Sequence, residues 1–410
     1  MRALLRRQLG LLGRAPEFRL LFLATFASGL GTWLAVIALT VDVEQRTHSG
    51  KWVAALLIVD FLPTVAIGLF FSSVIDQISR KLLMVGADVV RCAVFAALPL
   101  AQSAGAVVAL AAMAGLATGF FRPASMASLP NLVSDEDLPS ANGLLRTIEN
   151  VTITLGTLVG GIAAATQGPH LGYGLNAASF AISAVLLLGI PARGLQAAPV
   201  PSRGRLRDIG DGFRLVRRTP SLLAVVVVWN LIAFAAGGAN VAEIFLAKVS
   251  FNSGDFGFGF LWAASGVGLA VGSFLAPSFL AKRGIGPLYG VPIAVMAVAY
   301  GATAVSPNVW VAGCFLAVCG AGNGAAHVYN ALLVQRGAPD EVRGRAFGIV
   351  MSVTFASYGL GMIIGGPLTD AVGPRWLYGL AAAVSTVAAV FARTLARSAA
   401  EEPQAEPVPA

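Results

Sequence analysis

The chain has 410 residues, of which 57% are hydrophobic and 12% are charged, and its formal net charge is +8. Soluble domains carry about 25% charged residues, so this chain has too few charges to cover the surface of a soluble protein of its size. The composition excludes a cytosolic enzyme, a disordered protein and a secreted disulfide scaffold. It predicts a protein that crosses a membrane many times.

Long uncharged runs predict the membrane spans. No charged residue occurs in 20–41 (22 residues), 150–192 (43 residues) or 284–335 (52 residues). A spanning helix needs about 20 apolar residues, so the first run holds one helix and each longer run holds two. We predict an all-α polytopic fold with twelve transmembrane helices near 20–42, 52–75, 83–102, 105–122, 141–166, 172–192, 221–245, 256–281, 286–305, 308–334, 346–369 and 375–394.

The distribution of Lys and Arg predicts the direction of insertion. With a cytoplasmic N-terminus, 22 of the 28 basic residues lie in cytoplasmic segments, and only four lie outside, namely Arg46, Lys51, Lys248 and Arg375. An excess of this kind marks the cytoplasmic side. We expect both termini in the cytoplasm and the protein in the inner cell membrane. Contact with the bilayer, and not with nucleic acid, then accounts for the positive charge.

The two halves of the chain match at an offset of 205 residues. Gly160–Gly161 aligns with Gly365–Gly366, and Asp135–Glu136 with Asp340–Glu341, in one register without a gap. Parallel repeats of this kind build one class of transporter. We divide the chain into an N-terminal six-helix bundle at 1–192, a cytoplasmic linker with an amphipathic helix at 193–220, a C-terminal six-helix bundle at 221–398 and a disordered tail at 399–410.

No catalytic apparatus is visible in the sequence. It has no phosphate-binding loop for ATP and no metalloprotease or hydrolase motif, and the spacing of its three Cys matches neither a zinc site nor a redox pair. We therefore expect no enzyme activity, no cofactor and no metal site. The expected partners are a small-molecule substrate, protons and the lipid bilayer, and we expect a monomer.

The loop after the second predicted helix, Ser72 to Lys81, resembles the motif Gly-x-Leu-Ala-Asp-Arg-x-Gly-Arg-Arg of the major facilitator superfamily. Asp76, Arg80 and Lys81 match that motif, and three other positions differ. The resemblance implies a fold of two six-helix bundles in which these three charged residues latch the inner gate. The alternative is that the basic residues only fix the orientation of the chain.

The fifth predicted helix carries Gly156, Gly160 and Gly161 in a pattern that resembles the antiporter motif Gly-Pro-x-x-Gly-Gly of that family, with Thr157 at the proline position. Finer patterns, such as Pro339-Asp340-Glu341-Val342-Arg343-Gly344-Arg345, look like those of the macrolide-efflux-type drug exporters, and siderophore exporters share much of them. The resemblance implies a drug:proton antiporter.

Two pairs of opposite charges lie inside predicted spans. Asp88 and Arg91 are three residues apart, as are Arg146 and Glu149, so each pair shares one face of its helix. Together with Arg122 we interpret them as a charge network that supports the latch, because charges within a membrane are usually paired.

Two further carboxylates are candidates for proton coupling. Asp60 lies nine residues into the second predicted helix, about 13 Å deep at 1.5 Å per residue, and no basic residue occurs within four positions of it. Glu243 lies near the outer end of the seventh helix. An ionisable residue at such a position is a functional candidate by default. The alternatives are a hydrogen-bonded structural role for Asp60 and a hydrated interfacial role for Glu243. Asp42, at the end of the first helix, is interpreted as interfacial.

Aromatic and polar side chains on helices that line the cavity of this family, by resemblance, are candidates for substrate contact. They are Trp33, Trp229, Asn230, Asn240, His327 and Tyr329. Most aromatic residues of membrane helices face lipid or pack against other helices, and His327 can equally be a hydrogen-bonded structural residue.

These features predict a proton-coupled secondary transporter that exports small hydrophobic or amphipathic compounds by alternating access. One alternative is a dedicated exporter of a single metabolite, such as a siderophore or a lysophospholipid. The other is a membrane sensor that uses this fold without transporting anything.

Overall fold

The computed structural model describes residues 10–70, 78–134, 137–191, 220–283, 285–337 and 340–400. The motif residue Asp76, nearly all of the predicted linker and the tail from residue 401 lie outside these ranges. Every regular element in the described ranges is a helix, which confirms the all-helical fold class.

The long helices follow one another with short connections. They are α2 (Pro16–Thr47), α3 (Gly50–Phe70), α5 (Arg80–Ala97), α6 (Ala104–Leu132), α7 (Leu138–Gln167), α8 (Pro169–Leu188), α10 (Pro220–Phe245), α11 (Gly254–Arg283), α12 (Ile285–Ala304), α13 (Val309–Gly337), α14 (Asp340–Val372) and α15 (Pro374–Ala400). Two short elements extend this series, the 3-10 turn η1 (Leu98–Leu100) and the π-helical turn η3 (Leu246–Ser250). Nine helices in the described part are long and apolar enough to cross a membrane.

Several helices continue beyond the ends that hydropathy predicts. The first was expected at 20–42 and runs over Pro16–Thr47, and the fourth was expected to end at Arg122 and continues to Leu132. Hydropathy detects only the apolar part of a helix, whereas the backbone hydrogen bonds continue into its polar ends. Pro123 and Pro130 lie inside α6, and proline is tolerated within membrane-protein helices when neighbouring groups satisfy the freed carbonyls.

The internal repeat recurs in two helix–helix turns. Gly168 ends α7 with φ of 74°, and Gly373 ends α14 with φ of 88°. These glycines are 205 residues apart, the same offset as the sequence match, and each is followed by a proline that begins the next helix. Only glycine adopts a positive φ without strain, and proline suits the first turn of a helix. The two halves of the chain therefore connect these helices with the same Gly-Pro turn.

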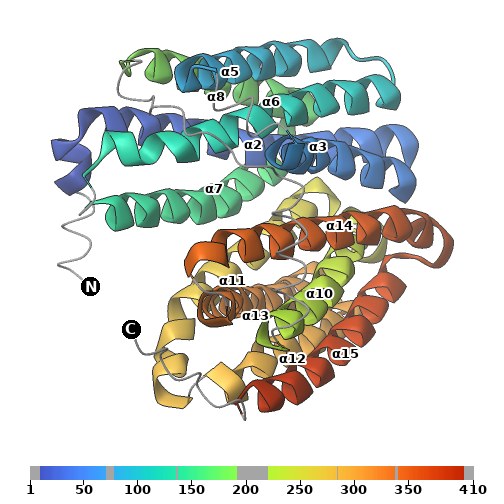
Figure 1. Ribbon diagram of the computed structural model, residues 1–410. Coiled ribbons are helices and arrows are strands. Elements are labelled where there is room, and N and C mark those ends of the chain that lie inside the picture. The colour runs from blue at the N-terminus through green and yellow to red at the C-terminus, as the bar shows by residue number, and fades with distance from the viewer. Residues whose placement is uncertain are drawn as a thin grey trace, which may run out of the picture. The chain divides into compact units, whose positions relative to one another are not determined.

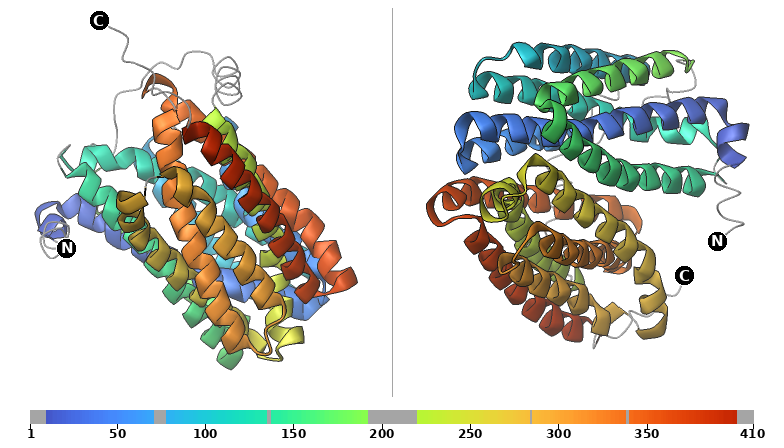
Figure 2. Two further views of the ribbon diagram at one scale, coloured as in Figure 1. Left: turned by 90° about the horizontal axis from the view of Figure 1, so that it is seen from below. Right: turned by 180° about the vertical axis from the view of Figure 1, so that it is seen from behind.

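Packing divides the chain into two compact units. Unit 1 comprises Met1–Ser202, Asn240–Gly266 and Met362–Pro374, and unit 2 comprises Arg203–Ala239, Val267–Gly361 and Arg375–Ala410. In unit 1, α2 packs on α7 and α8, α3 packs on α6, and α5 packs on α6 and α8 (Figures 1 and 2). In unit 2, α12 packs on α13.

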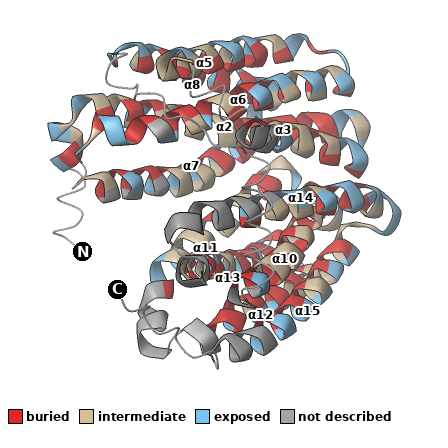
Figure 3. Ribbon diagram, in the orientation of Figure 1, coloured by how far each residue is buried: buried red, intermediate tan, exposed pale blue. Residues whose placement is uncertain are grey.

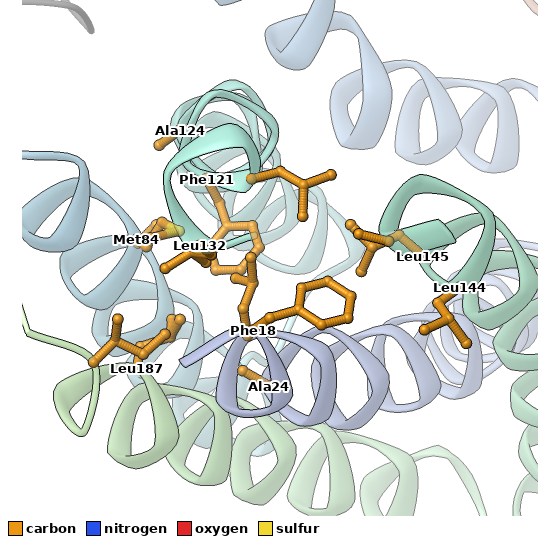
Figure 4. Close-up of a cluster of buried hydrophobic side chains, with 14 of the residues drawn as sticks. Phe18, Ala24, Met84, Phe121, Ala124, Leu132, Leu144, Leu145 and Leu187 are labelled. Atoms are coloured by element: carbon orange, nitrogen blue, oxygen red, sulfur yellow. The ribbon is translucent and has the colours of Figure 1, made fainter. Parts of the chain in front are cut away.

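The core at one end of unit 1 is a cluster of apolar side chains (Figure 4). Its buried members come from α2, α5, α6, α7 and α8 and from the residues that flank them: Leu11, Phe18, Leu21, Ala24, Met84, Ala87, Ala117, Phe121, Ala124, Leu129, Leu132, Ala141, Leu144, Leu145, Leu187 and Ile190. The cluster lies at the end that the basic residues predict to be cytoplasmic, so it holds the inner ends of five helices together.

Large apolar side chains also cover much of the accessible surface, and exposed positions alternate with buried ones along each helix (Figure 3). Examples on five different helices are Leu82, Val185, Phe274, Val298 and Val390. Soluble monomers rarely expose such continuous apolar surface, whereas a lipid environment solvates it. The surface therefore agrees with the nine helices of the described part that are long and apolar enough to cross a membrane.

The direction of insertion is testable with single cysteines on a background without native cysteines. We expect Gln102→Cys, which precedes α6, to react in intact cells with a thiol reagent that cannot cross the membrane. Arg14→Cys should be protected until the cells are permeabilised. Protection of Gln102→Cys together with labelling of Arg14→Cys would invert the topology predicted by the positive-inside rule.

Candidate functional site

The candidate site begins with Asp60 on α3, which is half-buried. Helix α6 approaches the backbone of α3 closely here, since a β-carbon on Gly115 would lie 2.6 Å from the Val59 carbonyl oxygen and 2.7 Å from that of Asp60. Within the described residues the Asp60 carboxylate has neither a hydrogen bond nor an ion pair. Asp60 differs in this respect from the paired carboxylates of the described residues, such as Asp88 and Asp42.

Glu243 lies on α10, two residues before the π-helical turn η3, and its side chain is buried. Asn240, one turn earlier on the same helix, is half-buried. Both belong to unit 1, as does Asp60.

Asp88 and Arg91 form a buried ion pair on α5. The Arg91 guanidinium carbon lies 4.4 Å from the ring centre of Phe121 and 4.3 Å from that of Phe180, so the cation is sandwiched between aromatic rings of α6 and α8. Cation–π contacts contribute most when they are desolvated, as here. This pair fastens three helices of unit 1 to one another.

Arg122 and Glu149 form the second ion pair of the expected network, with 2.7 Å between Arg122 Nη2 and Glu149 Oε1. The contact joins α6 to α7, and the Arg122 side chain is 58% exposed. Glu149 thus reaches a partner on another helix, whereas the sequence suggested its own neighbour Arg146. The side chain of Arg146 lies outside the described residues.

The gate motif is described only in part. Lys81 donates hydrogen bonds from Nζ to the carbonyl oxygens of Leu188, at 2.7 Å, and Ile190, at 2.6 Å. It therefore caps the end of α8, where free carbonyls favour a cation. Arg80 begins α5 and also interacts with neighbouring groups. Asp76, the acidic member of the motif, lies outside the described residues.

The three glycines of the antiporter-like motif lie where α7 touches other backbones. A β-carbon on Gly156 would lie 2.8 Å from the Leu30 carbonyl oxygen, and one on Gly160 would lie 2.8 Å from that of Leu34, both on α2. One on Gly161 would lie 2.8 Å from the α-carbon of Gly259 on α11. Glycine is therefore required on two faces of α7, because larger residues would push the helices apart.

Thr157 stands where the antiporter motif has proline. Its hydroxyl donates to the Ile153 carbonyl oxygen at 2.7 Å, and the residue is completely buried. The threonine keeps the backbone N–H that proline lacks, and α7 continues without interruption from Leu138 to Gln167. Thr157 therefore keeps a backbone N–H that the proline of the motif would remove, and the glycine contacts of α7 are present beside it.

The expected cavity residues form separate groups in the two units. In unit 1, Trp33 on α2 lies beside Trp262 on α11, with 5.9 Å between ring centres. In unit 2, Trp229 and His327 meet edge to face at 4.6 Å.

Polar members of the same set are engaged in hydrogen bonds. The Asn230 amide donates to the Val226 carbonyl oxygen and its Oδ1 accepts from Ser357 Oγ at 2.5 Å. The hydroxyl of the buried Tyr329 donates to the Ala276 carbonyl oxygen at 3.3 Å. These two residues tie helices of unit 2 together in this structure.

Asp42, expected at the membrane interface, belongs to a buried hydrogen-bond network near the end of α2. Asp42 is buried and accepts hydrogen bonds from Tyr173 Oη at 2.8 Å and Arg46 Nε at 2.7 Å. Arg46 in turn donates to the Ala101 carbonyl oxygen at 2.9 Å. Asp42 lies five residues before the end of α2 at Thr47, and its carboxylate is shielded by these neighbours.

Sequence reasoning also missed a charged cluster formed by Glu44, Lys248 and Asp255, and the role of Asp370. The contacts of Lys248 with Glu44, of Gln45 with Asp255 and of Gly50 with Asp370 join residues that are 204, 210 and 320 apart in sequence. Neither spacing nor periodicity in a single sequence indicates such pairs. The described residues contain no group of three potential metal ligands.

Long apolar helices, buried paired charges and close glycine contacts define a polytopic membrane transporter. The chain belongs to the Major Facilitator Superfamily, whose family model matches residues 21–350 and 231–410. The members of this class that resemble the chain are transporters and not enzymes.

Two curated relatives illustrate the likeness. The chain is 26% identical over 396 residues to the enterobactin exporter EntS of Shigella boydii. This match covers 94% of this chain and 90% of the exporter. It is 25% identical over 360 residues to the uncharacterised MFS-type transporter YfiS of Bacillus subtilis. This match covers 84% of this chain and 85% of that protein.

Solved structures share the fold. A bacterial homologue of the human lysosomal transporter Spinster superposes with a TM-score of 0.72 at 12% identity, covering 96% of this chain and 99% of that one. A bacterial homologue of the iron transporter ferroportin superposes with a TM-score of 0.71 at 14% identity, covering 94% and 99%.

The two ion pairs should differ in their importance for stability. We expect Arg91→Gln to lower the thermal midpoint of the purified protein strongly, because leaving one partner of a buried pair uncompensated costs about 3–5 kcal/mol. Arg122→Gln, in the exposed pair, should change stability by at most about 1 kcal/mol. Thermal unfolding of both variants in one detergent measures the difference, and equal midpoints would contradict this assignment.

Proposed function

We propose that this protein is a proton-driven exporter of small organic molecules in the bacterial inner membrane. The similarity to an exporter over 94% of the chain supports the direction of transport. The carboxylate of Asp60, which has no partner among the described residues, is the observation that supports proton coupling. The excess of basic residues in the segments predicted to be cytoplasmic supports the orientation.

In this proposal the two six-helix bundles, 1–192 and 221–398, alternate between an outward-open and an inward-open state. Asp60 takes up a proton when the cavity opens to the acidic exterior and releases it on the cytoplasmic side. A carboxylate already held by a cation, such as Asp88, cannot do this at little cost, because its partner would be left uncompensated. Glu243, near the predicted outer end of α10, is the second coupling residue in this scheme.

Substrate and proton then compete for one form of the transporter. A ligand shifts a conformational equilibrium only by its difference in affinity for the two states. If deprotonated Asp60 favours the substrate-bound form, substrate binding at constant pH expels a proton. Trp33 and Trp262 supply apolar area of the kind that binds amphipathic ligands.

Replacing Asp60 tests the coupling. We expect the wild-type protein in detergent to release protons when substrate is added, and the Asp60→Asn variant to bind substrate without proton release. The variant should also lose export driven by a pH gradient in liposomes. Glu17→Gln, which removes a carboxylate near the predicted inner surface, serves as the control and should behave like the wild type. Normal gradient-driven export by Asp60→Asn would remove Asp60 from the mechanism.

Two substrate classes fit the proposal. The family resemblance favours lipophilic drugs, and the relative named as an enterobactin exporter favours a siderophore. Everted membrane vesicles challenged with macrolides, lipophilic cations and siderophores separate them, since a drug exporter accepts several unrelated compounds and a dedicated exporter accepts one class. We expect siderophore accumulation that stops when the proton gradient is collapsed. Absence of movement of every compound and of protons would favour the alternative of a membrane sensor.

A further inference from the structure

Three buried polar atoms at the junction of α5 and α8 have no hydrogen-bond partner among the described residues. They are Asp88 Oδ2, Arg91 Nε and Ser183 Oγ. The three residues are 0%, 4% and 0% exposed, and α5 packs on α8. A buried polar group without a partner is costly, so in native proteins such groups bond to other protein atoms or to ordered water. Three of them at one junction point to a ligand that the protein itself does not supply.

The three atoms belong to one cluster. Asp88 and Arg91 lie one turn apart on α5, and in their ion pair Arg91 Nη2 donates to Asp88 Oδ1. On α8, Ser183 follows three residues after Phe180, whose ring centre lies 4.3 Å from the Arg91 guanidinium carbon. The Ser183 hydroxyl faces the Asp88 carboxylate but lies outside the geometry of a direct hydrogen bond. The ion pair therefore satisfies one oxygen of Asp88 and leaves the other without a donor.

Apolar side chains surround this cluster. The guanidinium of Arg91 lies between the buried rings of Phe121 and Phe180, and Met84, one turn before Asp88 on α5, is completely buried. The hydrocarbon core of a bilayer contains no water that could satisfy polar groups. A molecule that bonds to these three atoms must therefore be held inside the protein.

The chemistry of the three atoms selects the ligand. The ionised carboxylate of Asp88 only accepts hydrogen bonds, Arg91 Nε only donates them, and the Ser183 hydroxyl does both. Arg91 repels a further cation and Asp88 repels an anion, so the neutral pair favours an uncharged ligand. A water molecule donates and accepts at once, and buried waters make about three hydrogen bonds each. The number and the kind of partners at this junction match that requirement.

The polar face of α8 continues beyond Ser183. Asn176, seven residues earlier, lies two turns away on the same face. It is completely buried, and its Oδ1 accepts from Ser179 Oγ at 3.1 Å. Here α2 approaches α8 so closely that a β-carbon on Gly31 would lie 2.5 Å from Asn176 Oδ1. Ser183 is therefore the position where this polar face meets buried charges, whereas at Asn176 it meets the backbone of α2.

We propose that Asp88, Arg91 and Ser183 bind one structural water molecule between α5 and α8. The water accepts a hydrogen bond from Arg91 Nε, donates one to Asp88 Oδ2 and shares a third with the Ser183 hydroxyl. It completes the hydrogen bonding of the ion pair and connects that pair to α8. The inference concerns the stability of unit 1, and it depends neither on Asp60 nor on proton coupling, the substrate or the direction of transport.

Radiolytic labelling tests the site. Ionising radiation converts a bound water into a hydroxyl radical, which oxidises the side chains beside it. Phe180 is the reporter, because it contacts Arg91 and is 1% exposed, and Phe18, 0% exposed in the apolar cluster of the same unit, is the matched control. The full chain is irradiated in lipid nanodiscs, and peptide mass spectrometry measures the oxidation of each ring. We expect oxidation of Phe180 and protection of Phe18.

Two variants of nearly equal shape separate the hydroxyl of Ser183 from the volume of the side chain. Threonine and valine have the same branching, but only threonine carries a hydroxyl. We expect Ser183→Thr to keep the oxidation of Phe180 and Ser183→Val to lose it. Ser183→Val should also unfold at a lower temperature than Ser183→Thr, because Asp88 and Arg91 are then left with unsatisfied buried atoms.

Protection of Phe180 equal to that of Phe18 in the wild type would overturn the proposal, as would unchanged oxidation of Phe180 in Ser183→Val. Loss of the oxidation in both variants would contradict the role of the Ser183 hydroxyl. Equal unfolding temperatures of the two variants would contradict the role of the water in completing the ion pair. Because no transport is measured, failure of the proposed export function would leave these results unaffected.

Discussion

Charge compensation inside an apolar helix bundle is the constraint on which the rest of the structure depends. Only 12% of the residues are charged, and an isolated charge within a membrane is costly. Most of the buried charges described above are paired. Asp88 binds Arg91, Asp42 binds Arg46 and Tyr173, and Lys248 binds the carboxylates of Glu44 and Asp255. Helices are joined where these groups reach a second helix, through the Tyr173 hydroxyl, the aromatic rings beside Arg91 and the contact of Lys248 with Glu44. Such contacts matter because lipid removes the hydrophobic drive for association.

Asp60 is the exception to this pairing of charged groups. Asp60 has no such partner in the described part of the chain, although it lies on a helix that packs closely against α6. A paired carboxylate stabilises one arrangement of helices, whereas an unpaired one can change its protonation without breaking a contact. We therefore interpret Asp88 as a residue that holds helices together and propose Asp60 as the one that exchanges protons. Their neighbours, and not their residue type, make this distinction.

Much of the fold could be predicted from the sequence, because hydropathy and turn residues act locally. The helices follow the uncharged runs, and Gly168 with Pro169 was recognisable as a turn. The ion pair of Asp88 with Arg91 agrees with a spacing of three residues on one helix. Helix ends were less predictable, because helices such as α2 continue beyond their apolar part.

Long-range contacts were not predictable for a different reason. Lys248 meets Glu44 from 204 residues away, and Asp370 meets Gly50 from 320 residues away. A single sequence contains no information on which helix faces meet, or in which register. The repeat identified Gly161 and Gly366 as equivalent, but that each meets another backbone emerges only from the packing.

Thr157 has a mechanical consequence for α7. With its backbone N–H present, the helix has no break from Leu138 to Gln167, and its 30 residues form a rod about 45 Å long at 1.5 Å per residue. Near one end of this rod Gly161 touches Gly259, and one-third of the way from the other end Glu149 holds Arg122. Both contacts are therefore carried by one continuous hydrogen-bonded helix, with no proline kink between them.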